Sequence, residues 1–311
     1  MATASVARTR NDVSFLSRQS VRTRIWTTFV LVIVGIGALA LMLPVWFMFI
    51  TSLKPAGVAV AGYPIKWFPW TTEMGLGPLA TFVPVQPLWA NYVEAHVFMK
   101  WLTVYRNTIV VSTVTAIGDV VSAVFVAYGF ARFRAPMRNF MFTCLLATLM
   151  IPFAVRLVPE YLGFARLGLV NTFAPLMLPG WLGAAFFIFL LRQFFTTIPM
   201  AMDEAAIIDG AGPLRVLWQV LVPQIRPALI VVAISGFTYN WNDFLRPLLY
   251  LNSADMRTAA VALSYFNAMY GGTPFHLMMA GALVMLIPVL GLFFALQRYY
   301  IQGVVISGVK G

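Results

Sequence analysis

Residues 25–53 form one apolar run without a charged side chain, and this run constrains the fold more than any other feature. A helix needs about 20 apolar residues to cross the hydrocarbon of a bilayer, so the run is long enough to span it. It is too long for the core of a signal peptide, and it lacks a small-residue cleavage site. We therefore expect a transmembrane helix that the mature protein retains.

The composition extends this expectation to the whole chain. Hydrophobic residues make up 61% of it, charged residues only 10%, and the mean hydropathy is +0.85. Soluble domains carry about 25% charged residues, so this chain has too few to cover a water-facing surface. The net charge of +11 then indicates arginines at the cytoplasmic ends of membrane spans rather than a nucleic-acid-binding surface.

Further apolar runs complete the pattern. The second run is interrupted only by Asp119, and the third has Pro152 and Arg156 near its end. No alternation of period two extends over successive segments of about ten residues, which argues against a transmembrane barrel. The sequence predicts an all-α polytopic membrane protein with six transmembrane helices, at about residues 25–53, 108–131, 140–158, 175–191, 228–250 and 277–296.

Arginine and lysine residues orient these helices, because they are enriched in cytoplasmic loops. Basic residues cluster in the N-terminal tail, in the turn after the second span, and around the loop between the fourth and fifth spans. Both termini and that loop are therefore expected in the cytoplasm. The expected organisation is a cytoplasmic tail at 1–24, a six-helix domain at 25–298 with external loops 54–106 and 251–276 and a cytoplasmic loop 196–226, and a cytoplasmic tail at 299–311.

The cytoplasmic loop contains a polar segment, DEAAIIDGAGPLRVLWQVLVP, at residues 203–223. Asp203 and Glu204 fall in the first turns of a short predicted helix, where acids are favourable against the helix dipole. Gly210 and Gly212 then permit a turn. The segment therefore predicts a helical hairpin between the fourth and fifth transmembrane helices.

The second helix of this hairpin is amphipathic. Pro213 suits its first position, and Pro223 ends it. Leu214, Leu217 and Leu221 form an apolar stripe at i, i+3 and i+7. Two interpretations remain open on these grounds. The hairpin is either an interfacial element that rests on lipid headgroups or a docking element that fills a groove in a cytoplasmic partner.

The spacing within the hairpin resembles that of a known family. It reads E-A-A at 204–206, G at 210 and V-L-V-P at 220–223. This pattern is similar to the E-A-A-x3-G-x9-I-x-L-P loop of binding-protein-dependent ABC importer permeases, and differs only by Val for Ile and Val for Leu. Other segments resemble the carbohydrate branch of that family, and within it the smaller maltose permease subunit. They are NTIVVSTVTAIGDVVSAVFVAYGFARFRAP, LGLVNTFAPLMLP, FFIFLLRQFFTTIP, TYNWNDFLRPLLYL and QRYYIQGVVISGVKG, and the resemblance covers roughly residues 25–311.

This resemblance implies the transmembrane subunit of an ATP-driven ABC importer for a mono- or oligosaccharide, in the cytoplasmic membrane of a prokaryote. The implied partners are a second homologous permease, two ATPase subunits and an extracytoplasmic sugar-binding protein. In that family the hairpin docks into a cleft of the ATPase and transmits its closure to the spans. The resemblance thus assigns ATPase coupling to Asp203, Glu204, Ala205, Ala206, Asp209, Gly210, Leu217 and Pro223.

The chain shows no enzyme motif of its own. It has no G-x4-G-K-[ST] phosphate loop, and GGTPFH at 271–276 lacks both the lysine and the spacing. It has no G-x-S-x-G elbow. Two histidines and the single Cys144 do not make a zinc or haem ligand set. We expect no cofactor in this chain, with ATP and Mg bound by the partner ATPase.

Polar residues inside the second and fifth spans are candidates for the substrate path. An ionisable group in a span is a functional candidate by default, although Asp119 can instead hydrogen-bond between helices. Aromatic faces stack on sugars, and amides or carboxylates meet paired hydroxyls. The alternatives are interhelical hydrogen bonds for Asn240 and Asp243, or an ion pair between Asp243 and Arg246. The candidates are Asp119, Tyr239, Asn240, Trp241, Asn242 and Asp243.

The external loop 251–276 is a candidate contact with the binding protein, by resemblance, through Tyr265, Phe266, Asn267 and Tyr270. The alternative is a simple connector.

The arginine-rich N-terminal tail has the composition of a disordered anchor. The Gly- and Pro-rich segment 71–87 looks like an insertion without an assignable purpose.

Two other functions compete with sugar import. A stand-alone secondary carrier would show an inverted repeat and broken helices with paired charges, but no convincing repeat is present and only Asp119 lies deep in a span. The same importer machinery acting on a polyol phosphate or another small solute is the second alternative. An anionic cargo would require basic residues within the spans, whereas Arg156 and Arg246 lie at span ends.

Overall fold

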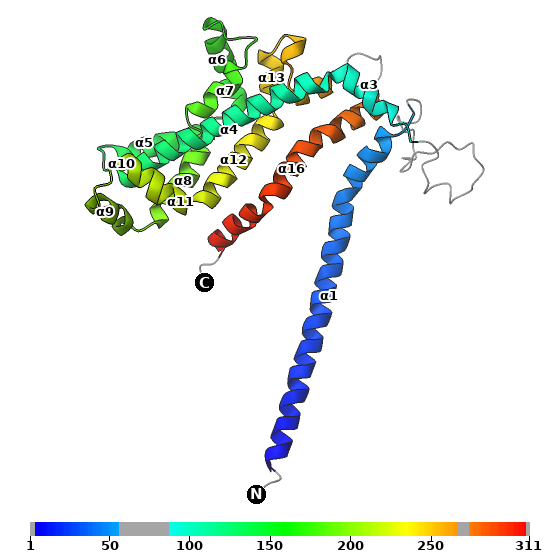
Figure 1. The fold of residues 1–311 in the computed structure, drawn as a ribbon, viewed down its shortest axis with the longest axis vertical. Coiled ribbons are helices and arrows are strands. Elements are labelled where there is room, and N and C mark those ends of the chain that lie inside the picture. The colour runs from blue at the N-terminus through cyan, green and yellow to red at the C-terminus, as the bar shows by residue number, and fades with distance from the viewer. Residues whose placement is uncertain (1–3, 56–86, 267–273, 309–311) are drawn as a thin grey trace, which may run out of the picture. The chain divides into compact units, whose positions relative to one another are not determined.

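The computed structural model describes residues 4–55, 87–266 and 274–308, and over these ranges it is helical without a β-strand (Figure 1). The chain divides into two compact units, residues 1–88 and 89–311. The all-α prediction is confirmed for the described residues.

The first unit is built on one long helix, α1 (Ala4–Ser52). Its apolar part, Thr23–Ser52, is long and apolar enough to cross a membrane. The side chains along this part are mostly exposed, for example Leu31, Leu39 and Leu41. The N-terminal tail was predicted to be disordered, and this is wrong for residues 4–22, because α1 continues through them without a break.

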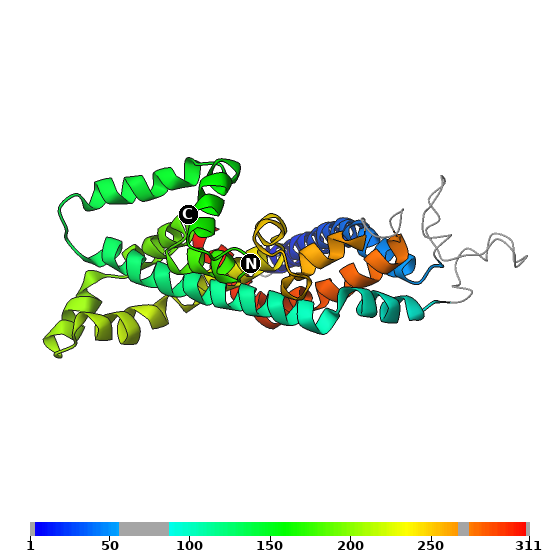
Figure 2. The ribbon, with the colours of Figure 1, turned by 90° about the horizontal axis from the view of Figure 1, so that it is seen from above.

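The second unit is organised around one long helix, α4 (Trp101–Arg132), which extends along its length (Figures 1 and 2). α4 packs against α12, α8 and α7. The other elements are α3 (Ala90–Met99), α5 (Arg138–Ala147), η2 (Thr148–Met150), α6 (Phe153–Arg166), α7 (Ala174–Trp181), α8 (Ala185–Thr197), α9 (Met200–Ile208), α10 (Pro213–Arg215), η3 (Val216–Leu221), α11 (Val222–Gln224), α12 (Arg226–Trp241), α13 (Leu245–Tyr250), η4 (Ala254–Met256), α14 (Ala259–Ser264) and α16 (Phe275–Gly308).

Glycines allow α7 and α12 to approach α4 closely. A Cβ placed on Gly180 of α7 would lie 2.7 Å from the carbonyl oxygen of Thr115, and one on Gly236 of α12 would lie 3.5 Å from the Cα of Ala116. Interiors are close-packed, so a contact of 2.7 Å leaves no room for a side chain. Small residues are enriched where membrane helices meet for the same reason.

Four of the predicted spans coincide with helical stretches that are long and apolar enough, within the described residues, to cross a membrane. The number rises to six only if two bent pairs, residues 138–150 with 153–166 and residues 213–224 with 226–241, each form one span. The predicted third span is bent by 101° between residues 138–150 and 153–166, with Pro152 at the break. The predicted fifth span ends at Trp241 instead of continuing to residue 250, and α13 follows as a separate short helix.

Candidate functional site

The predicted hairpin is present and lies at one end of the second unit, next to the end of α4 (Figure 1). Helix α9 leads into a turn at Gly210, whose φ is +83°. This conformation is strained for residues with a Cβ and accessible to glycine. The turn is closed by hydrogen bonds from the Gly210 and Ala211 backbone N–H groups to the carbonyls of Ile207 and Ala206, both 2.9 Å. The chain then returns through α10, η3 and α11.

The inner face of the hairpin belongs to the core of the second unit. Leu217 and Leu221 are fully buried, and they belong to one apolar cluster with Ala127 of α4 and Leu191 and Phe195 of α8. The predicted leucine stripe is therefore divided, because Leu214 is 62% exposed. Leu217 and Leu221 pack into the core instead of facing lipid or a partner, and a π-helical turn spans residues 216–221.

Two polar side chains of α4 fasten the hairpin. The Nε of Arg132 lies 2.6 Å from the Oδ2 of Asp203, and these side chains are only 6% and 7% exposed. The same arginine donates from Nη2 to the carbonyl of Ile198 at 3.0 Å, and the hydroxyl of Tyr128 donates to the carbonyl of Pro213 at 3.1 Å. Burial raises the pKa of the Asp203 carboxyl above its ordinary value, and the charge of Arg132 opposes this rise. We call these five residues the α4 clamp.

The outer face of the hairpin is exposed and mainly apolar. The acids Glu204 and Asp209 lie on it together with Ala205 and Gly210. Of the residues assigned to ATPase coupling, these four are exposed, Ala206 and Pro223 are half-buried, and Asp203 and Leu217 face the interior. The large apolar side chains exposed on it include Ile207, Ile208 and Leu214, whereas the ring of Trp218, although 47% exposed, lies 5.9 Å from that of Phe125 of α4.

A second polar feature is a cavity of about 510 Å³ beside the middle of α4. Ligand pockets in proteins are typically about 300–1,000 Å³, so its size is that of a small-molecule site. Its polar lining combines residues from α4, η2, α6, α12 and α13, and α8 adds the rings of Phe186 and Phe187. The polar residues are Thr115, Asp119, Thr148, Arg156, Tyr239, Asn240 and Arg246.

Asp119 reaches this cavity through a gap between two glycines. A Cβ on Gly180 would lie 3.2 Å from its Oδ1, and a Cβ on Gly236 would lie 2.8 Å from its Oδ2. Asp119 is 6% exposed. Over the described part of the chain, no basic nitrogen lies within 4.0 Å of its carboxylate.

Arg246 lines the same cavity, but its guanidinium is already engaged. Its Nε lies 2.6 Å from the Oδ2 of Asp243, and its Nη2 donates to the Oδ1 of Asn240 at 3.0 Å. The amide of Asn240 donates in turn to the carbonyl of Gly236 at 2.7 Å. The ion pair between Asp243 and Arg246 that the sequence left open is therefore present. Its side chains are 9% and 14% exposed, so it is buried rather than at the surface.

The six substrate-path candidates thus separate into two groups. Asp119, Tyr239 and Asn240 line the cavity, whereas the other three do not. Trp241 is 1% exposed and packs against the rings of Phe237 and Tyr105. Asn242 is exposed and bonds the carbonyl of Thr238, and Asp243 is committed to Arg246. The sequence reasoning did not select Thr115, Thr148, Arg156 or Arg246 as path candidates, although each was a polar residue in or beside a predicted span.

The candidate contacts with a binding protein are only partly described. Phe266 does not fit this role, because it is fully buried and its ring stacks on that of Phe98 with centroids 4.5 Å apart. Tyr265 is half-buried, and the guanidinium of Arg257 lies 3.7 Å from its ring centroid. Asn267 and Tyr270 lie outside the described residues, as does the segment 71–86 of the predicted insertion.

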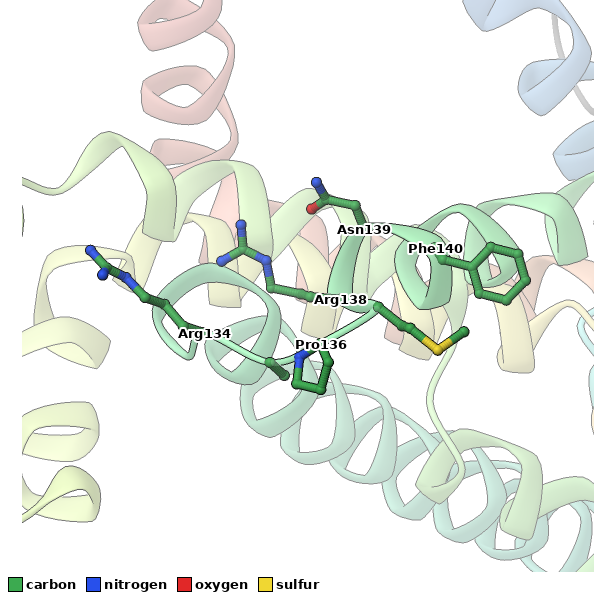
Figure 3. Close-up of a pocket in the computed structure, with 7 residues that line it drawn as sticks. Arg134, Pro136, Arg138, Asn139 and Phe140 are labelled. Carbon is green, nitrogen blue, oxygen red and sulfur yellow. The ribbon is translucent and has the colours of Figure 1, made fainter.

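A basic cleft of about 430 Å³ is formed by residues 134–140 in the turn between α4 and α5 (Figure 3). Figure 3 shows the side chains of Arg134 and Arg138 extending to the same side of the turn at Pro136. Arg138 also donates from Nη1 to the carbonyl of Phe133 at 3.2 Å. The cleft follows Arg132 directly, so this arginine-rich turn lies at the same end of α4 as the hairpin. Within the described ranges, no group of three or more His, Cys, Asp or Glu side chains is placed to hold a metal ion.

Comparison with known proteins gives a consistent result. Residues 119–306 match the family described as the inner membrane component of binding-protein-dependent transport systems. The chain is 32% identical over 261 residues to the sn-glycerol-3-phosphate transport system permease protein UgpE of Brucella abortus (strain 2308), covering 80% of this chain and 92% of that protein. It is 32% identical over 220 residues to the arabinooligosaccharides transport system permease protein AraQ of Halalkalibacterium halodurans, and the match covers 71% of this chain and 77% of that protein.

A solved structure shares the fold. It is the crystal structure of a bacterial ABC transporter involved in the import of the acidic polysaccharide alginate, and one of its chains superposes with a TM-score of 0.73. The sequence identity is 22%, and the match covers 89% of this chain and 97% of that one.

Proposed function

The chain belongs to the family of inner-membrane components of binding-protein-dependent transport systems, and we propose that its hairpin is the joint through which an ATPase drives transport. The chain is thus a permease subunit of an ABC importer rather than an enzyme. ATP and Mg would be bound by the partner ATPase. The observation that carries the proposal is the hairpin itself, exposed on its outer face and fastened to α4 on its inner face.

The two faces suit the two tasks of such a joint. The outer face offers Ile207, Ile208 and Leu214 to a groove, with the exposed Glu204 on the same helix as the two isoleucines. Short amphipathic helices dock into apolar grooves through anchors of this kind. Lipid headgroups are the alternative surface, but the E-A-A and glycine spacing at 204–210 favours the ATPase.

The inner face would pass the movement on to α4. A close-packed interior transmits displacement because it has no space to absorb it. The α4 clamp adds charged and neutral hydrogen-bonding contacts at the start of each arm of the hairpin, at Asp203 in α9 and at Pro213 in α10. Asp119 lies on the same helix as Tyr128, nine residues earlier, and lines the polar cavity. A shift of the hairpin would therefore move one wall of that cavity.

The cargo we propose is a sugar. AraQ is named for arabinooligosaccharides, and the cavity has the hydroxyl, amide and carboxylate groups that bind sugar hydroxyls. Family membership also implies an ATPase and a binding protein as partners. We further propose a second homologous permease, a pair of ATPase subunits, and both chain termini in the cytoplasm, which agrees with the arginines around the α4–α5 turn and the hairpin.

The test is transport by the reconstituted complex. The chain is purified with the partner permease and ATPase, placed in proteoliposomes, and supplied with the binding protein and radiolabelled arabinotriose, maltose or sn-glycerol-3-phosphate. We expect uptake of a neutral sugar that requires both ATP and the binding protein, and that is abolished by Glu204→Lys while the complex still assembles. Sugar uptake without ATP, driven by an ion gradient, would contradict the proposal.

A further inference from the structure

The charged residues that line the polar cavity favour neutral cargo molecules over anionic ones. Arg246 is the buried basic residue of the cavity lining, but Asp243 and Asn240 already occupy its guanidinium at 2.6 and 3.0 Å. An anion would have to displace one of these partners, and removing a partner from a buried charge is costly. Arg156, the other basic residue of the lining, is exposed, whereas Asp119 is 6% exposed.

Asp119 favours neutral molecules with hydroxyl groups over anions. Its carboxylate lines the cavity without a hydrogen bond or ion pair to any residue of the described ranges. A buried carboxylate needs hydrogen-bond donors, and each of its oxygens can accept more than one. A phosphate or carboxylate brought beside it would be repelled, whereas hydroxyl groups would donate to it.

The groups around Asp119 leave its carboxylate as the main acceptor for a sugar ring. The hydroxyl of Thr115 already donates to the carbonyls of Val111 and Leu176, at 2.7 and 3.3 Å, and the amide of Asn240 is bonded to Gly236 and Arg246. The ring of Tyr239, 63% exposed, lies on the same lining and offers a face for stacking. Gly180 and Gly236 keep the gap in which the carboxylate lies, because a Cβ at either position would lie close to its oxygens. These side chains come from this chain alone, so the cavity is formed without the partner permease.

We propose that this cavity is a binding site for a neutral, hydroxyl-rich molecule such as one sugar unit, and that Asp119 is the residue that excludes anionic cargo. The inference rests on the proposed function, since it assigns to this subunit a direct contact with the transported molecule. Asp119 accepts hydroxyl hydrogen bonds, and the pair of Arg246 and Asp243 holds Asn240 in place.

The experiment measures protection of a cysteine inside the cavity. Cys144 is the only cysteine of the chain and is replaced by Ala. Ala184, which lines the cavity, then becomes the single thiol in the variant Ala184→Cys. The full complex in nanodiscs reacts with a small maleimide in the presence of arabinose, glucose, glycerol, sn-glycerol-3-phosphate or inorganic phosphate. The matched control is Asn252→Cys, at an exposed loop position outside the cavity lining.

Neutral sugars should slow the reaction of Ala184→Cys and leave that of Asn252→Cys unchanged. At about 100 mM sugar, a Kd of about 50 mM leaves a third of the cavities empty, so the rate should fall about threefold. The two phosphate probes should give no protection. Adding Asp119→Asn, which keeps the shape and removes the charge, should weaken sugar protection about tenfold, in the range of one charged hydrogen bond.

Three results would overturn the inference. They are no protection by any neutral sugar, protection by the phosphates equal to or greater than that by sugars, and sugar protection that persists in Asp119→Asn. The readout needs neither ATP nor binding protein, so it separates this inference from the proposed function. Sugar import without thiol protection would support the proposed function and refute the binding site. Thiol protection without sugar import would support the binding site and refute the proposed function.

Discussion

The α4 clamp gives the sharpest prediction, because its central pair is buried on both sides. Replacing Arg132 by Met, or Asp203 by Leu, leaves one charge without its partner at a position where the side chains are 6% and 7% exposed. Removing one member of a buried pair costs about 3–5 kcal/mol. Because about 1.4 kcal/mol changes an equilibrium tenfold, the hairpin should detach from α4 at least about 100 times more often.

The double variant Arg132→Met/Asp203→Leu should behave differently. It leaves no buried charge, and only the carbonyl of Ile198 loses its donor, which costs about 1–3 kcal/mol. The single substitutions should therefore add up to about 6–10 kcal/mol while the double costs far less, a coupling of several kcal/mol between two residues in contact.

Hydrogen exchange measures this detachment directly. Peptides from residues 200–224 of the assembled complex should exchange much faster in both single variants and near the wild-type rate in the double variant, since exchange reports local opening. Peptides from residues 277–296 serve as the internal control and should not change. Transport per ATP hydrolysed should fall in the single variants and recover in the double. If both single variants showed hydrogen exchange and transport per ATP hydrolysed at the wild-type level, the role of the clamp would be refuted.

Three further predictions follow from other positions. Gly210→Pro should leave the subunit in the membrane but abolish ATP-dependent uptake, because a φ of +83° is closed to proline; wild-type uptake would count against the hairpin geometry. Tyr128→Phe removes only the hydrogen bond to Pro213 and should cost about 1 kcal/mol, measurable as a few-fold faster exchange of residues 213–221. Gly236→Ala would place a Cβ 2.8 Å from Asp119 and should reduce sugar uptake more than complex abundance, with Gly129→Ala, a position with open space around it, as the neutral control.

The features predicted correctly from the sequence are those with local signals. Apolar runs predicted the spans, and the glycines and Pro213 predicted the turn, because each depends on residues a few positions apart. The leucine stripe was expected to face lipid or a partner, and this is wrong for Leu217 and Leu221, because they pack into the cluster with α4 and α8 and leave only Leu214 exposed.

Long-range partners explain the remaining differences. In the sequence, Arg132 is one of several arginines in the turn after the predicted second span. Only the fold brings it to Asp203, 71 positions later. Asn240 and Asp243 share a helical spacing, but the helix ends at Trp241 and Asp243 turns to Arg246. Phe266 was expected at a partner surface and packs instead on Phe98, a residue of the preceding external segment.

Cross-linking from the outer face of the hairpin tests the central claim most directly. A photoactivatable maleimide on Ala205→Cys, in a chain carrying Cys144→Ala, samples an exposed position next to Glu204. In the intact complex, the product identified by mass spectrometry should be the ATPase subunit, and its yield should change between the nucleotide-free and ATP-bound states. The same reagent on Asn252→Cys should not reach the ATPase. Cross-links from Ala205→Cys to lipid alone, in every nucleotide state, would contradict the account and favour a hairpin that rests on the membrane surface.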